Sequence, residues 1–189
     1  QIFLAAISCY INSALPQTEP GEAAVDTLSA IRDLQASEPE VVSLRSIFPF
    51  WYEAAEPFRV IGNIYFVGSR GLAMYFIPTS DGHILIDGGV PENAPMIAES
   101  IRKLGYRPED IRLLLNTHSH IDHSGGLSAL KSLSGAALLA TEGDRLSLES
   151  GEPLGAEDRA EFRAPPVTVD RTVKDGEVIT SGDVSLTAY

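Results

Sequence analysis

The segment Asn116-Thr117-His118-Ser119-His120-Ile121-Asp122-His123-Ser124-Gly125-Gly126 decides which fold and which chemistry the sequence predicts. The sequence has 189 residues and four histidines, and three of these histidines lie between positions 118 and 123. Imidazole nitrogens and carboxylate oxygens are the ligands that Zn²⁺ takes when thiolates are absent. We therefore predict a metal site with four ligands from this one segment: His118, His120, Asp122 and His123.

The spacing of these ligands predicts two metal ions. In an extended segment, residues two apart point the same way, so His118 and His120, with Asp122 on the same side, can converge on one ion. As the chain turns into a following helix, Asp122 and His123 can face a second ion. Two metals about 3.5–4 Å apart can share a bridging hydroxide. We expect Gly125-Gly126 to let the backbone turn sharply away without crowding the metals.

Two polar residues of the preceding apolar stretch have simpler interpretations. His83 lies within a predicted strand, and we interpret it as structural, because a lone histidine is more often a structural residue than a ligand. Asp87 ends that strand, directly before Gly88-Gly89. It is either a turn residue or a carboxylate that orients the metal-binding loop from behind the ligands. The sequence favours neither of these two interpretations.

The hydrophobic pattern around the segment predicts an α/β fold. Apolar runs joined by turns such as Gly62-Asn63 indicate antiparallel strands. The period then changes to helical spacing at Ile97, Ile101 and Leu104, and Asn93 is expected to cap that helix. The predicted strands are 60–61, 64–67, 72–77, 83–87, 111–115, 136–140, 172–179 and 184–189, and the predicted helices are 93–105, 127–135 and 142–150.

The composition limits the possible partners. Acidic residues outnumber basic residues by 26 to 14, for a formal net charge of -12, and the basic residues form no run. A nucleic-acid-binding protein needs clustered Lys and Arg to displace counterions from phosphates, so we predict no nucleic-acid partner. We attribute the acidity to solubility. The single cysteine, Cys9, can form neither an internal disulfide nor a cysteine-rich zinc site.

The start of the sequence resembles the end of a secretory signal. Residues 2–11 form an apolar run that is too short to cross a bilayer as a helix. We interpret residues 1–14 as a truncated signal peptide, which predicts a periplasmic or secreted protein with no stable membrane span. Alternatively, Cys9 is a lipid-attachment residue. We expect residues 15–57 to form an N-terminal arm and residues 58–189 an incomplete domain, within a fragment cut at both ends.

His-x-His-x-Asp-His at the end of a strand and before Gly-Gly resembles the signature of the metallo-β-lactamase superfamily. The resemblance runs from about residue 48 to the end and is closest to class B β-lactamases of the third subclass. The first subclass usually has a non-ligand at the place of His123, and the second usually has Asn at the place of His118. The flanking segments that carry the resemblance are 57–71, 82–89, 104–110 and 127–135.

The resemblance implies a partial αββα fold, with a mixed, largely antiparallel sheet, flanking helices and a missing C-terminal part. It implies two Zn²⁺ per full-length chain, the first bound by His118 and His120 and the second by Asp122 and His123. In the family, each zinc takes a further histidine from segments that would follow residue 189. Two ligands per metal are fewer than the usual three, so we expect the 189 residues alone to bind metal weakly or not at all.

The implied function is a zinc-dependent hydrolase of antibiotic resistance, which opens small β-lactam substrates by attack of a metal-bound hydroxide. Asp122 is the implied catalytic residue, because it would orient that hydroxide. An alternative is another hydrolase of the superfamily, either a lactonase or a glyoxalase-type thioester hydrolase. A non-catalytic binding protein or an inactive remnant is the alternative outside enzymes. The sequence predicts neither the preferred β-lactam nor the oligomeric state.

Overall fold

The computed structural model describes residues 43–189, so the predicted signal peptide and most of the predicted arm lie outside the described residues. The chain divides into two units, residues 1–49 and residues 50–189. The described part of the first unit contains helix α3 (Leu44–Ile47), whose first turn is capped by the Ser43 side chain. The 3₁₀ helix η1 (Pro49–Tyr52) follows. The domain boundary at residue 58 stays a prediction.

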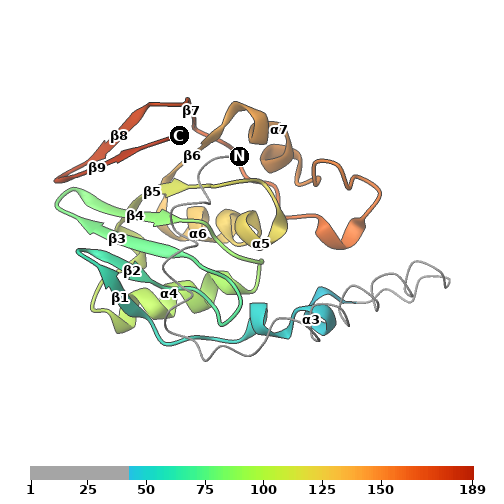
Figure 1. The fold of residues 1–189 in the computed structure, drawn as a ribbon, viewed down its shortest axis with the longest axis horizontal. Coiled ribbons are helices and arrows are strands. Elements are labelled where there is room, and N and C mark those ends of the chain that lie inside the picture. Colours follow the sequence, from blue (N-terminus) through green and yellow to red (C-terminus); the bar gives the residue numbers. More distant parts are fainter. Residues whose placement is uncertain (1–42) are drawn as a thin grey trace. The chain divides into compact units, whose positions relative to one another are not determined.

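The second unit is built on a mixed seven-stranded sheet, whose strands lie side by side in chain order (Figure 1). The first four strands pair antiparallel, and the last four pair parallel. A parallel pair needs a long crossover, and helices fill each of these connections. The mixed sheet with flanking helices confirms the predicted α/β class. The strands are β1 (Phe58–Ile61), β2 (Ile64–Phe66), β3 (Tyr75–Thr79), β4 (Gly82–Ile86), β5 (Ile111–Leu115), β6 (Ala137–Thr141) and β7 (Arg171–Val173).

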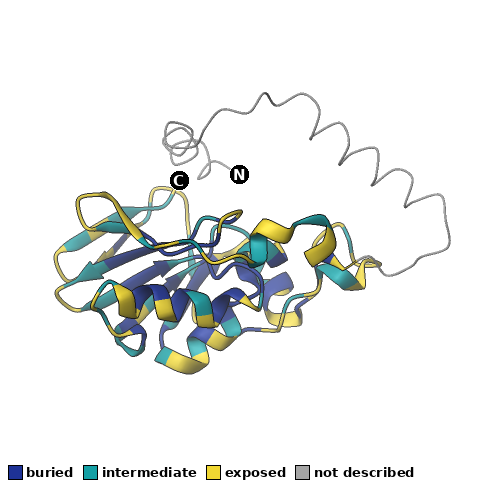
Figure 2. Ribbon diagram, turned by 90° about the horizontal axis from the view of Figure 1, so that it is seen from below, coloured by how far each residue is buried: buried dark blue, intermediate teal, exposed yellow. Residues whose placement is uncertain are grey.

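Helices in the crossovers pack on the sheet with their apolar sides. Helix α6 contacts both α4 and β5, and α7 contacts β6 and β7. Figure 2 shows buried residues on the sides of these helices that face the sheet and exposed residues on their outer sides. The crossover elements are α4 (Asn93–Lys103), η2 (Pro108–Asp110), α5 (Ile121–Ser124), α6 (Leu127–Ser134), α7 (Glu142–Ser150) and η3 (Ala160–Phe162).

The hydrophobic core lies between these helices and one face of the sheet. Because side chains alternate across a strand, every second residue of the central strands reaches this face. The strands contribute fully buried side chains from Phe76, Leu85, Leu114 and Leu138. The helices contribute Ile97, Ile101, Leu127 and Leu130, which are also buried. Burying each such side chain stabilises the fold by roughly 1.5–3 kcal/mol, which fixes the strand ends that carry the site.

Helix α4 begins differently from the sequence expectation. The N-cap residue is Glu92, and Asn93 is the first residue of the helix. The Asn93 side chain is fully buried, where its Oδ1 accepts a hydrogen bond from the Val90 N–H at 3.0 Å and its Nδ2 donates to the Trp51 carbonyl at 2.9 Å. The prediction that Asn93 caps the helix is therefore wrong, because its amide is used to fix the loop before the helix.

Strands β8 (Val178–Ser181) and β9 (Val184–Thr187) form a separate two-stranded hairpin. Its tip contacts the turn between β3 and β4, where the Ser80 N–H donates to Asp183 Oδ1 at 2.8 Å. The hydroxyls of Thr79 and Ser181 lie 3.3 Å apart at the same contact. Within the described residues, no helix is long and apolar enough to cross a membrane.

Candidate metal site

The candidate site lies at the edge of the sheet where three parallel strands end. Asp87 follows β4, the histidine segment follows β5, and Asp144 follows β6 in the first turn of α7. The sheet pairing continues one residue beyond β4, where the Asp87 N–H donates to the Leu115 carbonyl at 2.8 Å. In sheets of this kind, the carboxyl ends of parallel strands form the usual ligand-binding edge.

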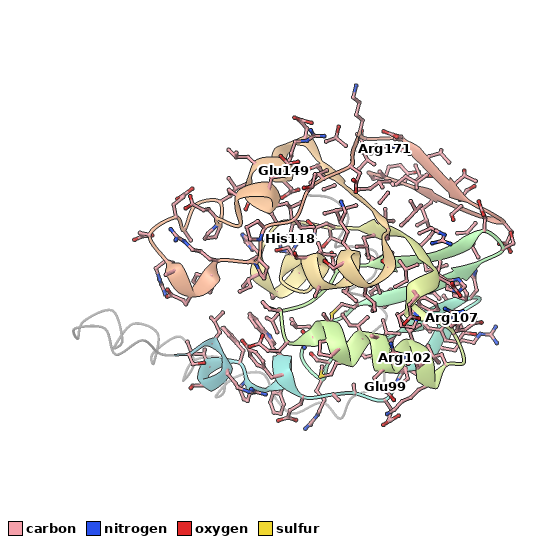
Figure 3. The ribbon with its side chains drawn as sticks, turned by 180° about the vertical axis from the view of Figure 1, so that it is seen from behind. Glu99, Arg102, Arg107, His118, Glu149 and Arg171 are labelled. Carbon is pink, nitrogen blue, oxygen red and sulfur yellow. The ribbon has the colours of Figure 1, made fainter. Side chains whose placement is uncertain are left out.

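Three of the four predicted ligands converge at this edge. The potential ligand atoms of His118, Asp122 and His123 all lie within 4.8 Å of one another. The ring centroids of His118 and His123 are 4.0 Å apart, and His123 Nε2 lies 3.4 Å from Asp122 Oδ2. His118 is half-buried, and Figure 3 shows it apart from the labelled side chains of Arg102 and Arg107.

His120 lies beside this group without joining it. Its ring centroid is 4.8 Å from that of His118, but its side chain is exposed. Its backbone forms the N-cap of α5, where its carbonyl accepts hydrogen bonds from the N–H groups of His123 at 2.9 Å and Ser124 at 2.8 Å. The structure thus gathers three predicted ligands and places the fourth next to them. The assignment of ligand pairs to two metals stays a prediction.

Asp87 is a buried hydrogen-bond acceptor behind the histidine segment. Its carboxylate accepts hydrogen bonds from the Thr117 N–H at 2.8 Å, the Thr117 hydroxyl at 2.7 Å and the Asn116 amide at 3.3 Å. His123 Nδ1 lies 2.8 Å from Asp87 Oδ2. Among the described residues, Asp87 is the only non-glycine with a positive φ, 63°, which Asp tolerates better than most residues. Asp87 is therefore a turn residue by its backbone conformation, and its side chain also contacts the histidine segment.

The charges at the site favour a cation between the carboxylates. Burial lowers the pKa of the His123 imidazole, but hydrogen bonds to Asp122 and Asp87 outweigh burial and raise the pKa to about 9. Burial raises the pKa of Asp122, but its hydrogen bond to His123 holds that pKa below its ordinary value. Burial, followed by the neighbouring His123 and His120 rings, lowers the pKa of His118. Metals bind a neutral imidazole and an ionised carboxylate, so a metal ion at His123 would displace the proton that the raised pKa holds on this ring at pH 7.

The two glycine pairs of the site pack backbone against backbone. The Gly88 N–H donates to the His123 carbonyl at 2.7 Å, and the Gly126 N–H donates to the Gly89 carbonyl at 3.0 Å. A Cβ atom on Gly126 would lie 2.2 Å from the Gly88 carbonyl oxygen. The φ values of Gly125 and Gly126, -56° and -83°, are open to any residue. The prediction of a glycine-dependent sharp turn is therefore wrong, because close backbone contact is what requires glycine here.

Sequence analysis missed three residues that hold the segment. The Thr117 hydroxyl lies 3.3 Å from Nδ1 of both His118 and His123. The Ser124 hydroxyl and the Asp144 carboxylate bind backbone groups of the segment. For Asp144 a partial signal existed, because Thr141-x-x-Asp144 is a typical helix start. That pattern indicates a helix but not a contact to a segment 25 residues earlier.

Comparison with known proteins gives one family. The model of the metallo-beta-lactamase superfamily matches residues 61–188. The chain is similar to the structure of BJP-1, a subclass B3 metallo-β-lactamase of Bradyrhizobium japonicum, with 46% identity and a TM-score of 0.72 over 74% of this chain and 53% of that chain. MEM-A1, a subclass B3 metallo-β-lactamase from a soil metagenome library, gives 46% identity and a TM-score of 0.66 over 72% and 53%.

The chain is also similar to an N-acyl homoserine lactonase of Bacillus cereus, at 31% identity over 78 residues, which cover 29% of this chain and 31% of the lactonase. The chain thus spans about half the length of the solved structures and about a third of the lactonase. The family match extends from the last residue of β1 to the end of β9, so it covers strands β2 to β9 as well as the histidine segment.

Proposed function

The chain belongs to the metallo-β-lactamase superfamily, and on this premise we propose that the protein is a zinc-dependent hydrolase that opens the β-lactam ring. The observation that carries the proposal is the convergence of His118, Asp122 and His123, whose potential ligand atoms lie within 4.8 Å of one another. The similarity to subclass B3 metallo-β-lactamases at 46% identity supports the choice of substrate class.

The residues of the group fit zinc. Because Nδ1 of His123 faces Asp87, Nε2 is the nitrogen left to bind a metal. This Nε2 lies 3.4 Å from Asp122 Oδ2. Two ligand atoms each about 2.1 Å from one tetrahedral zinc lie about 3.4 Å apart, so the observed separation suits a shared ion. A set of nitrogen and oxygen ligands without thiolate also suits Zn²⁺.

We assign the ligands to two zinc ions, as the resemblance to the superfamily implies. His118 and His120 would hold the first ion, and Asp122 and His123 would hold the second. Each pair supplies two of the three or four protein ligands that zinc ordinarily takes. His120 is exposed beside the group, with its ring centroid 4.8 Å from that of His118.

Bound zinc would supply a water of lowered pKa and would polarise the lactam carbonyl. Asp122 would be the catalytic residue, because the carboxylate that faces His123 also has an oxygen that can accept a hydrogen bond from the attacking water and orient it. Asp87 would hold the His123 ring with Nε2 toward the metal. The Thr117 hydroxyl, hydrogen-bonded to Asp87, lies against both imidazoles and limits their rotation.

The proposed substrate is a small β-lactam, and the proposed role is antibiotic resistance. β-Lactams act outside the cytoplasm, so a periplasmic or secreted location suits this substrate. The signal peptide proposed for residues 1–14 and the lipid-attachment alternative at Cys9 lie outside the described residues.

Hydrolysis of nitrocefin by the full-length protein tests the proposal. We expect hydrolysis that a chelator abolishes and added Zn²⁺ restores, and we expect Asp122→Ala to remove it. Asp81→Ala is a matched control, because Asp81 is an exposed carboxylate in the turn before β4. Metal content from native mass spectrometry completes the test. Zinc retention without nitrocefin hydrolysis would overturn the β-lactam substrate, and absence of zinc would favour an inactive remnant.

Lactone hydrolysis is the second candidate activity. It is favoured by the 31% identity to the N-acyl homoserine lactonase. The same group of imidazoles and carboxylates can serve lactones or thioesters, because both are attacked at a carbonyl. Parallel rates with nitrocefin, an acyl homoserine lactone and a glutathione thioester would rank the three substrates. A preference for either ester over nitrocefin would replace the β-lactamase proposal.

A further inference from the structure

Ser119 separates two of the proposed first-zinc ligands, and its backbone is held from two directions. Its N–H donates to Asp144 Oδ1 at 3.0 Å. Its carbonyl accepts a hydrogen bond from the Ser124 hydroxyl at 3.0 Å, and that hydroxyl lies equally close to the His120 carbonyl. Ser119 itself is 7% exposed. Two side chains, those of Asp144 and Ser124, thus hold the peptide groups between His118 and His120.

Asp144 is itself positioned by the fold. Its Oδ2 accepts a hydrogen bond from the Thr141 hydroxyl at 2.6 Å, and its own N–H donates to that hydroxyl at 3.2 Å. Thr141 is the last residue of β6 and the N-cap of α7. Strand β6 pairs in parallel with β5, which leads directly into the histidine segment. The sheet therefore sets the distance between the Asp144 carboxylate and Ser119.

Helix capping alone does not account for this carboxylate. Thr141 already accepts the hydrogen bond from the first turn of α7, which is the contact that a cap supplies. Asp144 uses its second oxygen for the histidine segment instead. Asp87 holds Thr117 and His123, on either side of this part of the segment. The stretch between His118 and His120 depends on the two other contacts, from Asp144 and Ser124.

We propose that Asp144 is a positioning residue for metal binding, which fixes the peptide between His118 and His120 and thereby the backbone from which the two imidazoles reach one zinc. The proposal rests on the zinc site proposed above and extends it to a residue on another element. A carboxylate that orients ligands without touching the metal typically changes metal affinity by about 10–100-fold when it is removed.

Zinc affinity of the full-length protein, measured by competition with a chromophoric chelator, tests this role. We expect Asp144→Ala to weaken zinc binding by about 10–100-fold. Asp144→Asn should restore most of the affinity, because its amide oxygen can still accept the Ser119 N–H. Asp144→Glu keeps the charge but displaces the acceptor, so it should bind zinc less tightly than Asp144→Asn. The visible spectrum of bound Co²⁺ should change in Asp144→Ala, because the ligand geometry changes.

Asp170→Ala is the matched control. Asp170 also accepts a backbone N–H, from Leu138 at 2.7 Å, and it also pairs with a side chain, that of Lys131. Its contacts do not involve the histidine segment, so its loss should lower stability to urea without changing zinc affinity. Wild-type affinity in both Asp144→Ala and Asp144→Glu would overturn the proposal. An equal loss of affinity in Asp170→Ala would also overturn it, because the effect would then be general destabilisation.

These zinc measurements do not depend on the substrate. A protein that binds zinc tightly but leaves nitrocefin intact would disprove the β-lactamase function while the role of Asp144 is still decided by the affinities. Conversely, nitrocefin hydrolysis together with unchanged zinc affinity in the Asp144 variants would leave the function standing and remove the positioning role. A wild-type protein without zinc affinity would overturn the positioning role outright.

Discussion

Two polar residues at opposite ends of strand β4, His83 and Asp87, have different surroundings: aromatic rings at one end and hydrogen-bond donors at the other. At the end of the strand, Asp87 accepts hydrogen bonds from Asn116 and Thr117 and lies 2.8 Å from His123 Nδ1. At its start, His83 packs its ring against aromatic rings, with centroids 5.1 Å from Phe76 and 5.3 Å from Tyr106. One end is a polar network that holds potential metal ligands, and the other is an aromatic cluster.

The difference shows that two polar residues of one strand can have different roles, His83 in packing and Asp87 in holding the histidine segment. Buried polar groups are stable when each finds a partner, as at Asp87. His83 has no such set of partners. Burial lowers the pKa of its imidazole, and the Arg112 charge lowers it further. The Asp110 charge and a hydrogen bond with the Gly82 backbone act in the opposite direction but do not outweigh burial. The lowered pKa favours the neutral form of the ring. The interpretation of His83 as structural agrees with this packing, since it is far along the strand from the metal site.

Removing the Asp87 carboxylate should have the largest effect at the site end. Asp87→Ala leaves the Thr117 donors and the His123 ring without their buried acceptor, which costs roughly 3 kcal/mol of unfolding free energy. Zinc affinity should fall by about 10–100-fold. Urea unfolding and chelator competition measure the two effects. The control Asp81→Ala, at the other end of β4, should change stability by less than about 0.5 kcal/mol, and a comparable loss there would refute the contrast between the ends.

Adding one methyl group to the backbone contact should have the next largest effect. Gly126→Ala places a Cβ 2.2 Å from the Gly88 carbonyl oxygen, so the loops must separate, at a cost of roughly 1–3 kcal/mol. Gly143→Ala in α7 is the matched control, because its Cβ would lie 3.7 Å from the Thr141 hydroxyl oxygen, an ordinary contact distance. That variant should gain up to about 1 kcal/mol from helix propensity. Equal unfolding midpoints for the two variants would show that close packing does not require Gly126.

Replacing His83 should affect the pH dependence of stability and leave the metal site alone. The pKa of His83 is lower in the folded protein than its ordinary 6.5, so the unfolded chain takes up the proton first as the pH falls. This group therefore destabilises the fold progressively below about pH 6.5. His83→Phe should show a flatter loss of stability on acidification, measured by urea unfolding at several pH values. Its zinc affinity at neutral pH should equal that of the wild type, and a drop would contradict a purely structural role.

The smallest effect is expected for the charged surface far from both ends of β4. Figure 3 places Glu99, Arg102 and Arg107 together on the helix side of the molecule, away from His118. Arg102 lies 3.2 Å from the Glu109 carboxylate, and both side chains are well exposed. Exposed ion pairs contribute little because water and salt screen them. Arg102→Ala should therefore unfold at the same urea concentration as the wild type and bind zinc equally well, and a clear shift in either would disagree.

Local signals predicted those elements whose ends are marked in the sequence. Strand β5 and helix α7 have the predicted bounds, 111–115 and 142–150. Gly135 and Gly151 end helices in the left-handed conformation that glycine favours. The errors concern side chains and glycines whose partners come from another element. Asn93 is used for the preceding loop rather than for capping, and Gly126 faces Gly88 rather than allowing a turn.

The sequence by itself determined that three imidazoles and a carboxylate leave one strand end together, because ligand type and spacing are local properties. Only the tertiary structure decided which of them converge, His118, Asp122 and His123, and that His120 stays at the surface. It also decided that Asp87 and Asp144 contact the segment, across 36 and 25 residues of sequence. The physical reason is that three parallel strands must first pair in register before their carboxyl ends can bring these groups within hydrogen-bonding distance.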